Sequence, residues 1–491
     1  MIQFPKIIQG GMGVGVSNWS LANAVSKMGQ LGVVSGTALD QLFVRRLADG
    51  DTEGHMRRGL DAFPFPEMAR RIWQEYFVPG GKPEGAPYPT VPMHQRKDSR
   101  KLIELCMVSN FVEVFLAREG HKNPVGINFL EKVQTPHLAS IYGAMLAGVS
   151  YVLMGAGIPL HIPGVLDQLA FHQPVEYKLS VAGAPSEMDT QLRFDPREYM
   201  ETELPPLTRP KFVAIISSNT LATTMLKRAS GRVDGFIVEK HTAGGHNAPP
   251  RGKTQLNVIG EPIYGERDQV NLVALKELGV PFWMAGGYNT PERVQDALAA
   301  GAEGVQVGTV FALSRESGLR EDLKRSLLAQ VVADKAQVYT DPLASPTGFP
   351  FKVALMPGTL SGHTEYEART RVCDLGYLRE GYATEKGTIG YRCAAENKDA
   401  FLAKGGTIEE TVGRKCLCNA LMANVGYAQL RPDGREEQPL ITAGDGLNEA
   451  ARFLAPGETS YSAAEAVDSL LGLRPIGHLQ LDAHLHGAMT V

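Results

Sequence analysis

A histidine that follows two glycines is the first candidate for chemistry in this chain. His246 lies in the stretch VDGFIVEKHTAGGHNAPPRG, where an apolar run ends at Val238 and charged residues, then Gly244 and Gly245, take over. Glycines let the backbone approach a flat ring closely, and an imidazole can then exchange a proton with a group bound over that ring. Although a lone histidine is more often structural, the glycine pair before it favours catalysis. We therefore expect His246 to be catalytic.

Two further glycine-containing segments, MAGGYNTPERV and VQVGTVFALSRES, could bind a phosphate. In the first, Gly286 and Gly287 precede an expected helix, and in the second Gly308 and Thr309 precede another. Bare amides at helix N-termini, with a hydroxyl beside them, are typical of phosphate sites. Tight strand-to-helix turns that simply need glycine are the structural alternative.

Two amide side chains interrupt apolar runs near these segments. Asn128 in GINF and Gln306 in GVQVGT need hydrogen-bond partners if they are buried, and a flavin ribityl chain or phosphate could supply them. Neighbouring loop backbone is the alternative partner. Lys240 and His241 could hold an anionic group beside His246, although solvated loop charges are at least as common.

The elements that must position these residues are short apolar runs that recur through the first two thirds of the chain. Runs without alternation are expected of parallel strands buried on both faces, and helix-like segments such as SNWSLANAVSKMG and TPERVQDALAAG separate them. Eight such units predict an α/β fold, a (β/α)8 TIM barrel. An open doubly wound sheet would need G-x-G-x-x-G after its first strand, which GGMGVGVS lacks. The runs are KIIQGGM, LGVVSG, PVGINF, YVLMGAG, FVAIIS, GFIVEKH, PFWMAGG and GVQVGT.

The barrel is expected to span residues 1–325, with two long insertions at about 37–123 and 163–210. Both insertions leave the C-terminal ends of strands, the face on which barrel active sites lie, so we interpret them as lid or substrate-shaping segments. Residues 326–491 are expected to form a mainly helical C-terminal extension that carries most of the cysteines.

Four cysteines lie close together in the extension, at positions Cys373, Cys393, Cys416 and Cys418, while Cys106 is far away. Four thiolates could bind zinc or an iron–sulfur cluster. Their spacing matches no common paired C-x-x-C pattern, so unligated thiols are favoured and no bound metal is expected.

Composition excludes several classes of partner. The chain has 491 residues, a net charge of -4, 43% hydrophobic residues and no dense basic block, which argues against nucleic acid or a membrane surface as partner. The most apolar stretch, residues 137–160, is interpreted as a helix followed by a buried strand, with no membrane span. Five cysteines without an export signal predict a cytoplasmic protein.

Five ordered motifs, IIQGGM, GINF, EKHTAGGH, MAGG and VQVGT, resemble the FMN-dependent nitronate monooxygenases, formerly called 2-nitropropane dioxygenases. Related proteins are FMN-dependent enoyl-acyl carrier protein reductases of fatty acid and polyketide pathways. The resemblance covers residues 1–325 and implies FMN as cofactor and His246 as the catalytic histidine. Thr242 stands where the family usually has an acidic residue, and Glu239 where many members have Gln. The residues that the resemblance places on FMN are Gly11, Met12, Asn128, Glu239, Gly244, Gly286, Gly287, Gln306, Val307, Gly308 and Thr309.

The resemblance implies two possible functions, and a third, non-enzymatic function is the alternative to both. The first is oxidation of alkyl nitronates with O2 through reduced flavin, which the motif set favours slightly. The second is NAD(P)H-dependent reduction of an enoyl thioester, with the substrate free or on an acyl carrier protein, and the long insertions favour this class of relative. The third is a non-catalytic flavin-binding sensor or scaffold, which would have no use for His246. A homodimer is compatible with each of them.

Overall fold

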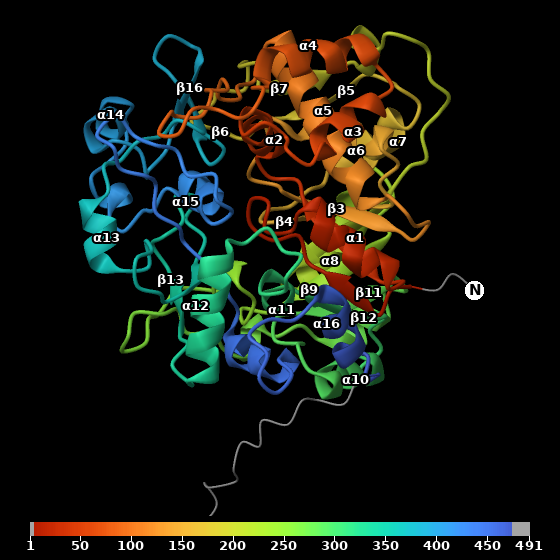
Figure 1. Ribbon diagram of the computed structural model, residues 1–491, viewed down its shortest axis with the longest axis vertical. Helices are drawn as coiled ribbons and strands as arrows, with labels where there is room; N and C mark the ends of the chain where they lie inside the picture. Colours follow the sequence, from red (N-terminus) through yellow and green to blue (C-terminus); the bar gives the residue numbers. More distant parts are fainter. Residues whose placement is uncertain (1–3, 474–491) are drawn as a thin grey trace, which may run out of the picture.

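A closed barrel of eight parallel strands forms the centre of the computed structural model, which describes residues 4–473 (Figure 1). All eight apolar runs become its strands, so the predicted TIM-barrel fold is confirmed. Around the barrel the order is β1, β12, β11, β9, β8, β4, β3, β2. The strand bounds are β1 (Ile7–Gln9), β2 (Leu31–Ser35), β3 (Val125–Leu130), β4 (Tyr151–Gly155), β8 (Lys211–Ile216), β9 (Gly235–Glu239), β11 (Phe282–Ala285) and β12 (Gly304–Val307).

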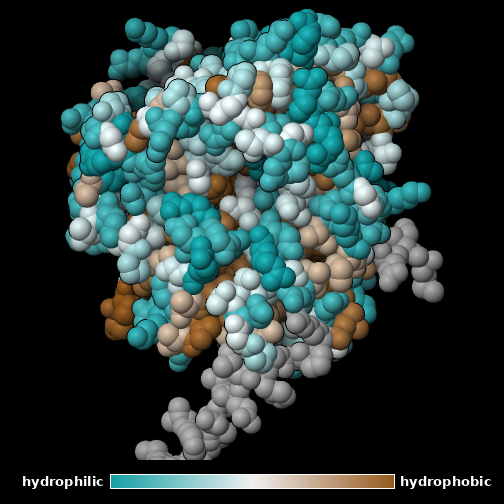
Figure 2. Space-filling view, viewed as in Figure 1, coloured by the Kyte–Doolittle hydropathy of each residue, from teal (hydrophilic) through white to brown (hydrophobic). Residues whose placement is uncertain are grey.

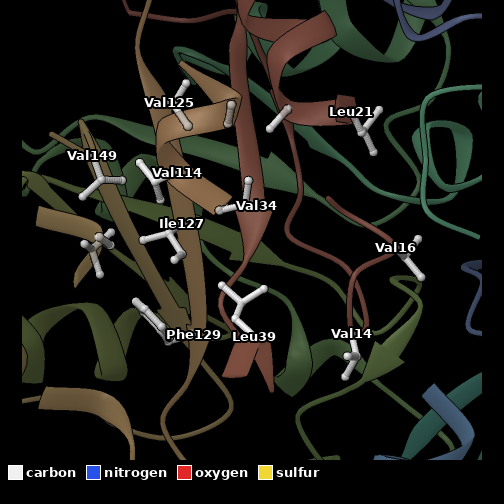
Figure 3. Close-up of a cluster of buried hydrophobic side chains, with 14 of the residues drawn as sticks. Val14, Val16, Leu21, Val34, Leu39, Val114, Val125, Ile127, Phe129 and Val149 are labelled. Carbon is white, nitrogen blue, oxygen red and sulfur yellow. The ribbon is translucent and has the colours of Figure 1, made fainter. Parts of the chain in front are cut away.

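Both faces of the barrel strands are buried, which explains the runs without alternation. Neighbouring residues enter different cores: Ile8 and Leu153 pack inside the barrel, whereas Ile7 and Val152 pack outward against helices. The outer core around β2 and β3 is built from branched aliphatic side chains and Phe129 (Figure 3). Side chains of adjacent strand residues point to opposite faces, so an uninterrupted apolar run supplies both cores at once.

Helices cover the barrel between most strands, and their ends follow the expected signals. Asn18 caps α1 by accepting a hydrogen bond from the Leu21 amide, and Thr290 caps α10 by accepting one from the Arg293 amide. The segment 137–160 contains a helix and then a strand, as predicted, because Gly148 breaks the helix at a φ of +75°. These helices are α1 (Trp19–Lys27), α6 (His137–Leu146), α8 (Asn219–Arg228), α9 (Leu272–Lys276), α10 (Pro291–Ala299) and α11 (Thr309–Ala312).

The two insertions lie above one side of the barrel, toward the top of Figure 1. The first is helical, and its long helix α5 packs along α6 and also contacts α1 and α2. The second contains a short antiparallel pair, β5 with β7. Their elements are α2 (Leu39–Ala48), α3 (His55–Asp61), α4 (Pro66–Tyr76), α5 (Arg100–Ala117), α7 (Ile162–Leu169), β5 (Val175–Lys178), β6 (Val181–Ala182), β7 (Gln191–Phe194) and η1 (Pro196–Glu198).

The C-terminal extension joins the barrel and the second insertion through strand pairing. β14 pairs with the short strand β10 (Gly245–His246), and β15 pairs with β6. The expected boundary at residue 325 falls inside α12 (Glu321–Val332). The further elements are β13 (Val338–Asp341), β14 (Phe351–Ala354), α13 (His363–Ala368), β15 (Glu380–Ala383), β16 (Ile389–Arg392), α14 (Lys398–Ala403), η3 (Glu409–Thr411), α15 (Leu417–Ala423), η4 (Asp445–Phe453) and α16 (Ala463–Leu470), with η2 (Glu266–Asp268) in the preceding barrel loop.

The surface seen in Figure 2 is mostly hydrophilic, with apolar side chains in small separate groups. The most exposed large apolar residue, Val258, lies in the loop after β10, next to the exposed Ile259. Within residues 4–473, no helix combines the length and the apolar character that crossing a bilayer requires.

Candidate functional site

One large cavity lies at the C-terminal ends of the barrel strands, where TIM-barrel active sites are built. It is open to solvent and is lined by both main-chain and side-chain atoms of the strand ends. The structure brings all twelve predicted site residues to this inner cavity. They are Gly11, Met12, Asn128, Glu239, Gly244, His246, Gly286, Gly287, Gln306, Val307, Gly308 and Thr309.

Glycine is required at several of these positions. Gly286 and Gly287 have φ values of +89° and +80°, and a Cβ on Gly286 would lie 2.7 Å from Thr242 Oγ1. A Cβ on Gly11 would lie 2.4 Å from Asn128 Cβ. The backbone is therefore bare along the wall of the cavity, which leaves main-chain amides open to a ligand.

Buried polar atoms without partners also line the inner cavity. Thr242 Oγ1, Asn289 Oδ1 and Gln306 Oε1 are buried and have no hydrogen-bond partner within the described residues. An unsatisfied buried oxygen costs about 1–3 kcal/mol, so such a group in a native fold is explained when a ligand satisfies it. Gln306 was predicted to need such a partner, whereas Thr242 and Asn289 were not singled out as ligands. These unpaired oxygens and the glycine wall fit a bound flavin, which offers both donors and acceptors.

His246 is held at the cavity by the C-terminal extension. Its Nε2 lies 2.7 Å from Ser345 Oγ, which in turn lies 2.8 Å from Thr347 Oγ1. The ring meets Phe351 edge-on, with 4.7 Å between centroids. Burial lowers the pKa of His246 to about 4. The imidazole is therefore neutral at pH 7, and its Nδ1, which has no partner among residues 4–473, is free to interact with a substrate.

Glu239 is the acidic group in the wall of the inner cavity, at the end of β9. Burial raises the pKa of Glu239 to about 7, so the carboxyl group can hold or release a proton at neutral pH. Neither lysine nor arginine is found among the residues described as lining this cavity. The inner cavity therefore offers no side-chain cation to an anionic reacting group.

A second cavity of about 970 Å3 adjoins the first and shares Glu239 and His246 with it. This outer cavity contains the basic side chains of Lys240, His241 and Arg251. The ring of His241 stacks on Tyr264 with centroids 4.1 Å apart. Both basic residues considered in the sequence, Lys240 and His241, thus lie beside the site but outside the inner cavity.

Sequence reasoning missed the wall that the C-terminal extension contributes. It consists largely of apolar side chains and includes one cysteine already noted as a metal ligand candidate. No local periodicity marks these positions, since they come from short elements and loops. They are Phe351, Tyr377, Leu378, Leu417, Cys418 and Leu421.

A buried hydrogen-bonded network fixes this wall to the first insertion. The Tyr377 hydroxyl donates to Asp40, whose other carboxylate oxygen lies 3.1 Å from His94 Nε2. His94 is also paired with Asp98 and lies 3.5 Å from the sulfur of Cys106. Asp40, His94 and Cys106 are close enough to share a metal ion, but they already satisfy one another through these contacts.

Residues 204–341 match the family model described as nitronate monooxygenase. This segment contains β8, β9, β11 and β12 together with His246 and both glycine turns. This part of the chain is similar to the nitronate monooxygenases.

Other comparisons give partial or distant likenesses to members of this family and to other proteins. A dehydrogenase of Rhodococcus jostii that is named for a hydroxy-methyl-oxo-octahydro-indene-carboxyl-CoA substrate is 30% identical over 122 residues, which are 25% of this chain and 30% of that relative. Nitroalkane oxidase of Streptomyces ansochromogenes superposes over 96% of both chains with 15% identity and a TM-score of 0.46. FabK of Thermotoga maritima gives 18% identity and a TM-score of 0.45, over 96% of this chain and 92% of its own.

Proposed function

We propose that the protein is an FMN-dependent reductase of α,β-unsaturated acyl thioesters that draws its electrons from NAD(P)H. The distribution of charge over the two cavities carries this proposal. The inner cavity has no lysine or arginine in its described wall, whereas Lys240 and Arg251 line the outer one together with one aspartate, Asp268. This pattern fits a substrate with a neutral reacting group and an anionic tail.

An acyl thioester of coenzyme A or of an acyl carrier protein has this distribution of charge. Its conjugated carbonyl is neutral, and its pantetheine arm ends in phosphate, which basic side chains bind. Phe351, Leu378 and Leu421 provide an apolar wall for the acyl chain. The name of the Rhodococcus relative, a dehydrogenase of a CoA thioester, supports the same substrate class for the matched segment.

FMN would be held by glycine amides and amide side chains of the inner cavity, of which Gln306 Oε1 has no partner within the described residues. Gly286, Gly287 and Gly308 would place amides on its phosphate, and Asn128 and Gln306 would bind its polar chain and ring. When bound, FMN supplies the ability to accept and donate hydride.

His246 would bind the thioester carbonyl oxygen through an N–H donor. Because its imidazole is neutral, the ring can donate this hydrogen bond at pH 7 without carrying charge, and negative charge that develops on the oxygen strengthens the bond. Ser345 orients the ring through Nε2 and leaves Nδ1 for the substrate. Glu239 can supply a proton at the same cavity, since burial raises its pKa to about 7.

Oxidation of alkyl nitronates is the second candidate, and the match of residues 204–341 to the nitronate monooxygenase model favours it. A nitronate carries its negative charge on the reacting group itself. That charge would enter a cavity whose wall contains Glu239 but no lysine or arginine among the described residues, which is electrostatically unfavourable.

The deciding experiment uses the full chain loaded with FMN under anaerobic conditions. NADH and NADPH are expected to bleach the flavin, and a short 2-enoyl-CoA is expected to restore its colour in the absence of oxygen. Bleaching by an alkyl nitronate alone, with recovery only in air, would support the second candidate and contradict the first. If the His246→Ala variant retained flavin and full turnover, the role assigned to His246 would be wrong. If the wild-type protein bound flavin but showed no turnover with either substrate, a flavin-binding sensor would be the better description.

A further inference from the structure

Four cysteines of the C-terminal extension, distant in sequence, meet in one buried cluster beside the inner cavity. Cys373, Cys393, Cys416 and Cys418, here called the thiol cluster, pack together and form no disulfide. Cys393 follows β16, and Cys416 and Cys418 lie at the start of α15. Cys418 also lines the inner cavity, so the thiol cluster lies in its wall.

Hydrogen-bond donors point at the sulfur atoms of this cluster. The side-chain amide of Asn419 donates to Cys416 Sγ at 3.4 Å, and the Asn419 backbone amide bonds the same sulfur. Cys418 accepts from the backbone amides of Tyr377 and Leu378. Donors gathered around sulfur suit thiolates, which are strong acceptors, more than thiols, which accept weakly.

Unpaired positive charge also surrounds the thiol cluster. Arg379 interacts electrostatically with Cys373, and Arg414 with Cys393. Within residues 4–473 neither arginine forms an ion pair; their guanidinium groups donate to backbone carbonyls such as His94 O and Ser345 O. An anionic centre at the sulfurs would balance both charges.

Two carboxylates beside the thiol cluster are engaged with other cations, whereas Asp341 and Glu410 act on Arg414. Asp374 is paired with Arg431 at 2.6 Å, and Glu396 is paired with Lys404 at 2.8 Å.

The spacing of the sulfur atoms distinguishes a cluster from a single ion. Four thiolates around one zinc ion, with Zn–S bonds of about 2.3 Å, lie about 3.8 Å from one another. In the part of the chain that the structure describes, no three of the cysteine sulfurs lie within 4.8 Å of one another. Cys373 nevertheless lies within hydrogen-bond reach of Cys393. Thiolates that bind different irons of one cluster lie farther apart than thiolates that share one zinc ion.

We propose that the thiol cluster ligates an iron–sulfur cluster in the wall of the inner cavity. The four thiolates supply the complete ligand set, the amides of Tyr377, Leu378 and Asn419 bond to the ligating sulfurs, and Arg379 and Arg414 balance the negative charge. This site is independent of the proposed reductase activity, since its ligands and its contents do not depend on the substrate.

The test is analysis of iron and acid-labile sulfide in the full chain, purified without oxygen and reconstituted with ferrous iron and sulfide. We expect about two or more irons per chain with an equal amount of sulfide, and an electron paramagnetic resonance signal after reduction. Absence of iron and sulfide after reconstitution, or stoichiometric zinc in their place, would overturn the proposal.

Variants separate ligation from incidental binding of iron. Cys393→Ser and Cys416→Ser are expected to lose most of the iron, the sulfide and the signal, while Cys106→Ser, which alters the buried cysteine of α5, keeps all three. Far-ultraviolet circular dichroism checks that each variant is folded. If Cys393→Ser and Cys416→Ser kept the full iron and sulfide content, the thiol cluster would not be the ligand set; and if a ligand variant failed to fold, the metal content of the wild-type protein would still decide.

Discussion

His246 and Ser345 join the two halves of the site: Nε2 of the barrel histidine lies 2.7 Å from Oγ of a serine in the C-terminal extension. The two residues are 99 positions apart, and β10 and β14, which flank this contact, form an antiparallel pair. The extension is therefore part of the site, because it sets the orientation of the imidazole.

Replacing Ser345 should lower turnover without removing the flavin. Ser345→Ala deletes the hydroxyl that orients Nε2, and we expect kcat/KM to fall about tenfold, which corresponds to about 1.4 kcal/mol of transition-state stabilisation. Flavin content and KM for the nicotinamide should not change. Thr347→Val, one step further from the ring, is the matched control. An unchanged kcat in Ser345→Ala would show that this contact does not orient the histidine.

The basic residues of the outer cavity should matter for substrates that carry phosphate. Lys240→Ala and Arg251→Ala, combined, are expected to raise KM for a 2-enoyl-CoA about tenfold by removing charge-assisted contacts to phosphate. The same acyl group on N-acetylcysteamine has no phosphate and provides the control, for which KM should stay the same. Equal effects on the two thioesters would contradict the assignment of the outer cavity to the pantetheine phosphate.

Gly286 should tolerate no side chain. Gly286→Ala places a Cβ at a φ of +89° and 2.7 Å from Thr242 Oγ1, so both strain and crowding are expected. A loss of stability of about 1–2 kcal/mol and a clear loss of bound flavin should result. Gly287→Ala has a similar φ but 3.5 Å to its nearest atom, so its loss of flavin should be smaller. Titration of the flavin-free protein with FMN measures both effects.

Glu239 should make the stability of the flavin-free protein depend on pH. Its pKa is raised from 4.5 to about 7 on folding, so the folded state binds the proton more tightly than the unfolded state does. Stability is therefore greatest below about pH 4.5 with respect to this group, and falls as pH rises through 7. Above pH 7 the free energy of unfolding is lower than at pH 4.5 by at most about 3 kcal/mol on account of Glu239. Solvent in the open cavity screens the charge and reduces this loss.

Glu239→Gln removes this ionisation, so the variant should gain stability over the wild type at pH 8 and gain little at pH 5. Urea unfolding at both values measures the difference. Loading both proteins with FMN should change the difference in unfolding free energy between the variant and the wild type, because FMN would lie against the wall that contains Glu239. An equal gain at both pH values would contradict the raised pKa.

The barrel and most of the predicted flavin site could be read from the sequence because their signals are local. Each strand, such as β9, is a short apolar run, and its end is marked by glycines or polar residues within a few positions. Since the C-terminal ends of parallel strands meet at one face of a barrel, Asn128, Glu239 and Gln306 were expected there together. The structure places all three on the inner cavity.

The wall that closes the cavity could not be read in this way. Tyr377 reaches the site because its hydroxyl bonds to Asp40, which is 337 positions away, and β15 reaches the second insertion by pairing with β6. Similarly, the spacing of the cysteines matched no familiar metal motif, yet the fold brings Cys373 and Cys393 together.

By itself, then, the sequence determined the strands, the glycine turns and the position of His246 at the end of a strand, since backbone conformation and burial depend on residues close in the chain. Only the tertiary structure decided which side chains close the cavity, where the basic residues lie relative to the flavin site, and that four distant thiols share one place. Those relationships depend on long-range packing between the extension, the insertions and the barrel, and no local pattern of residue types encodes them.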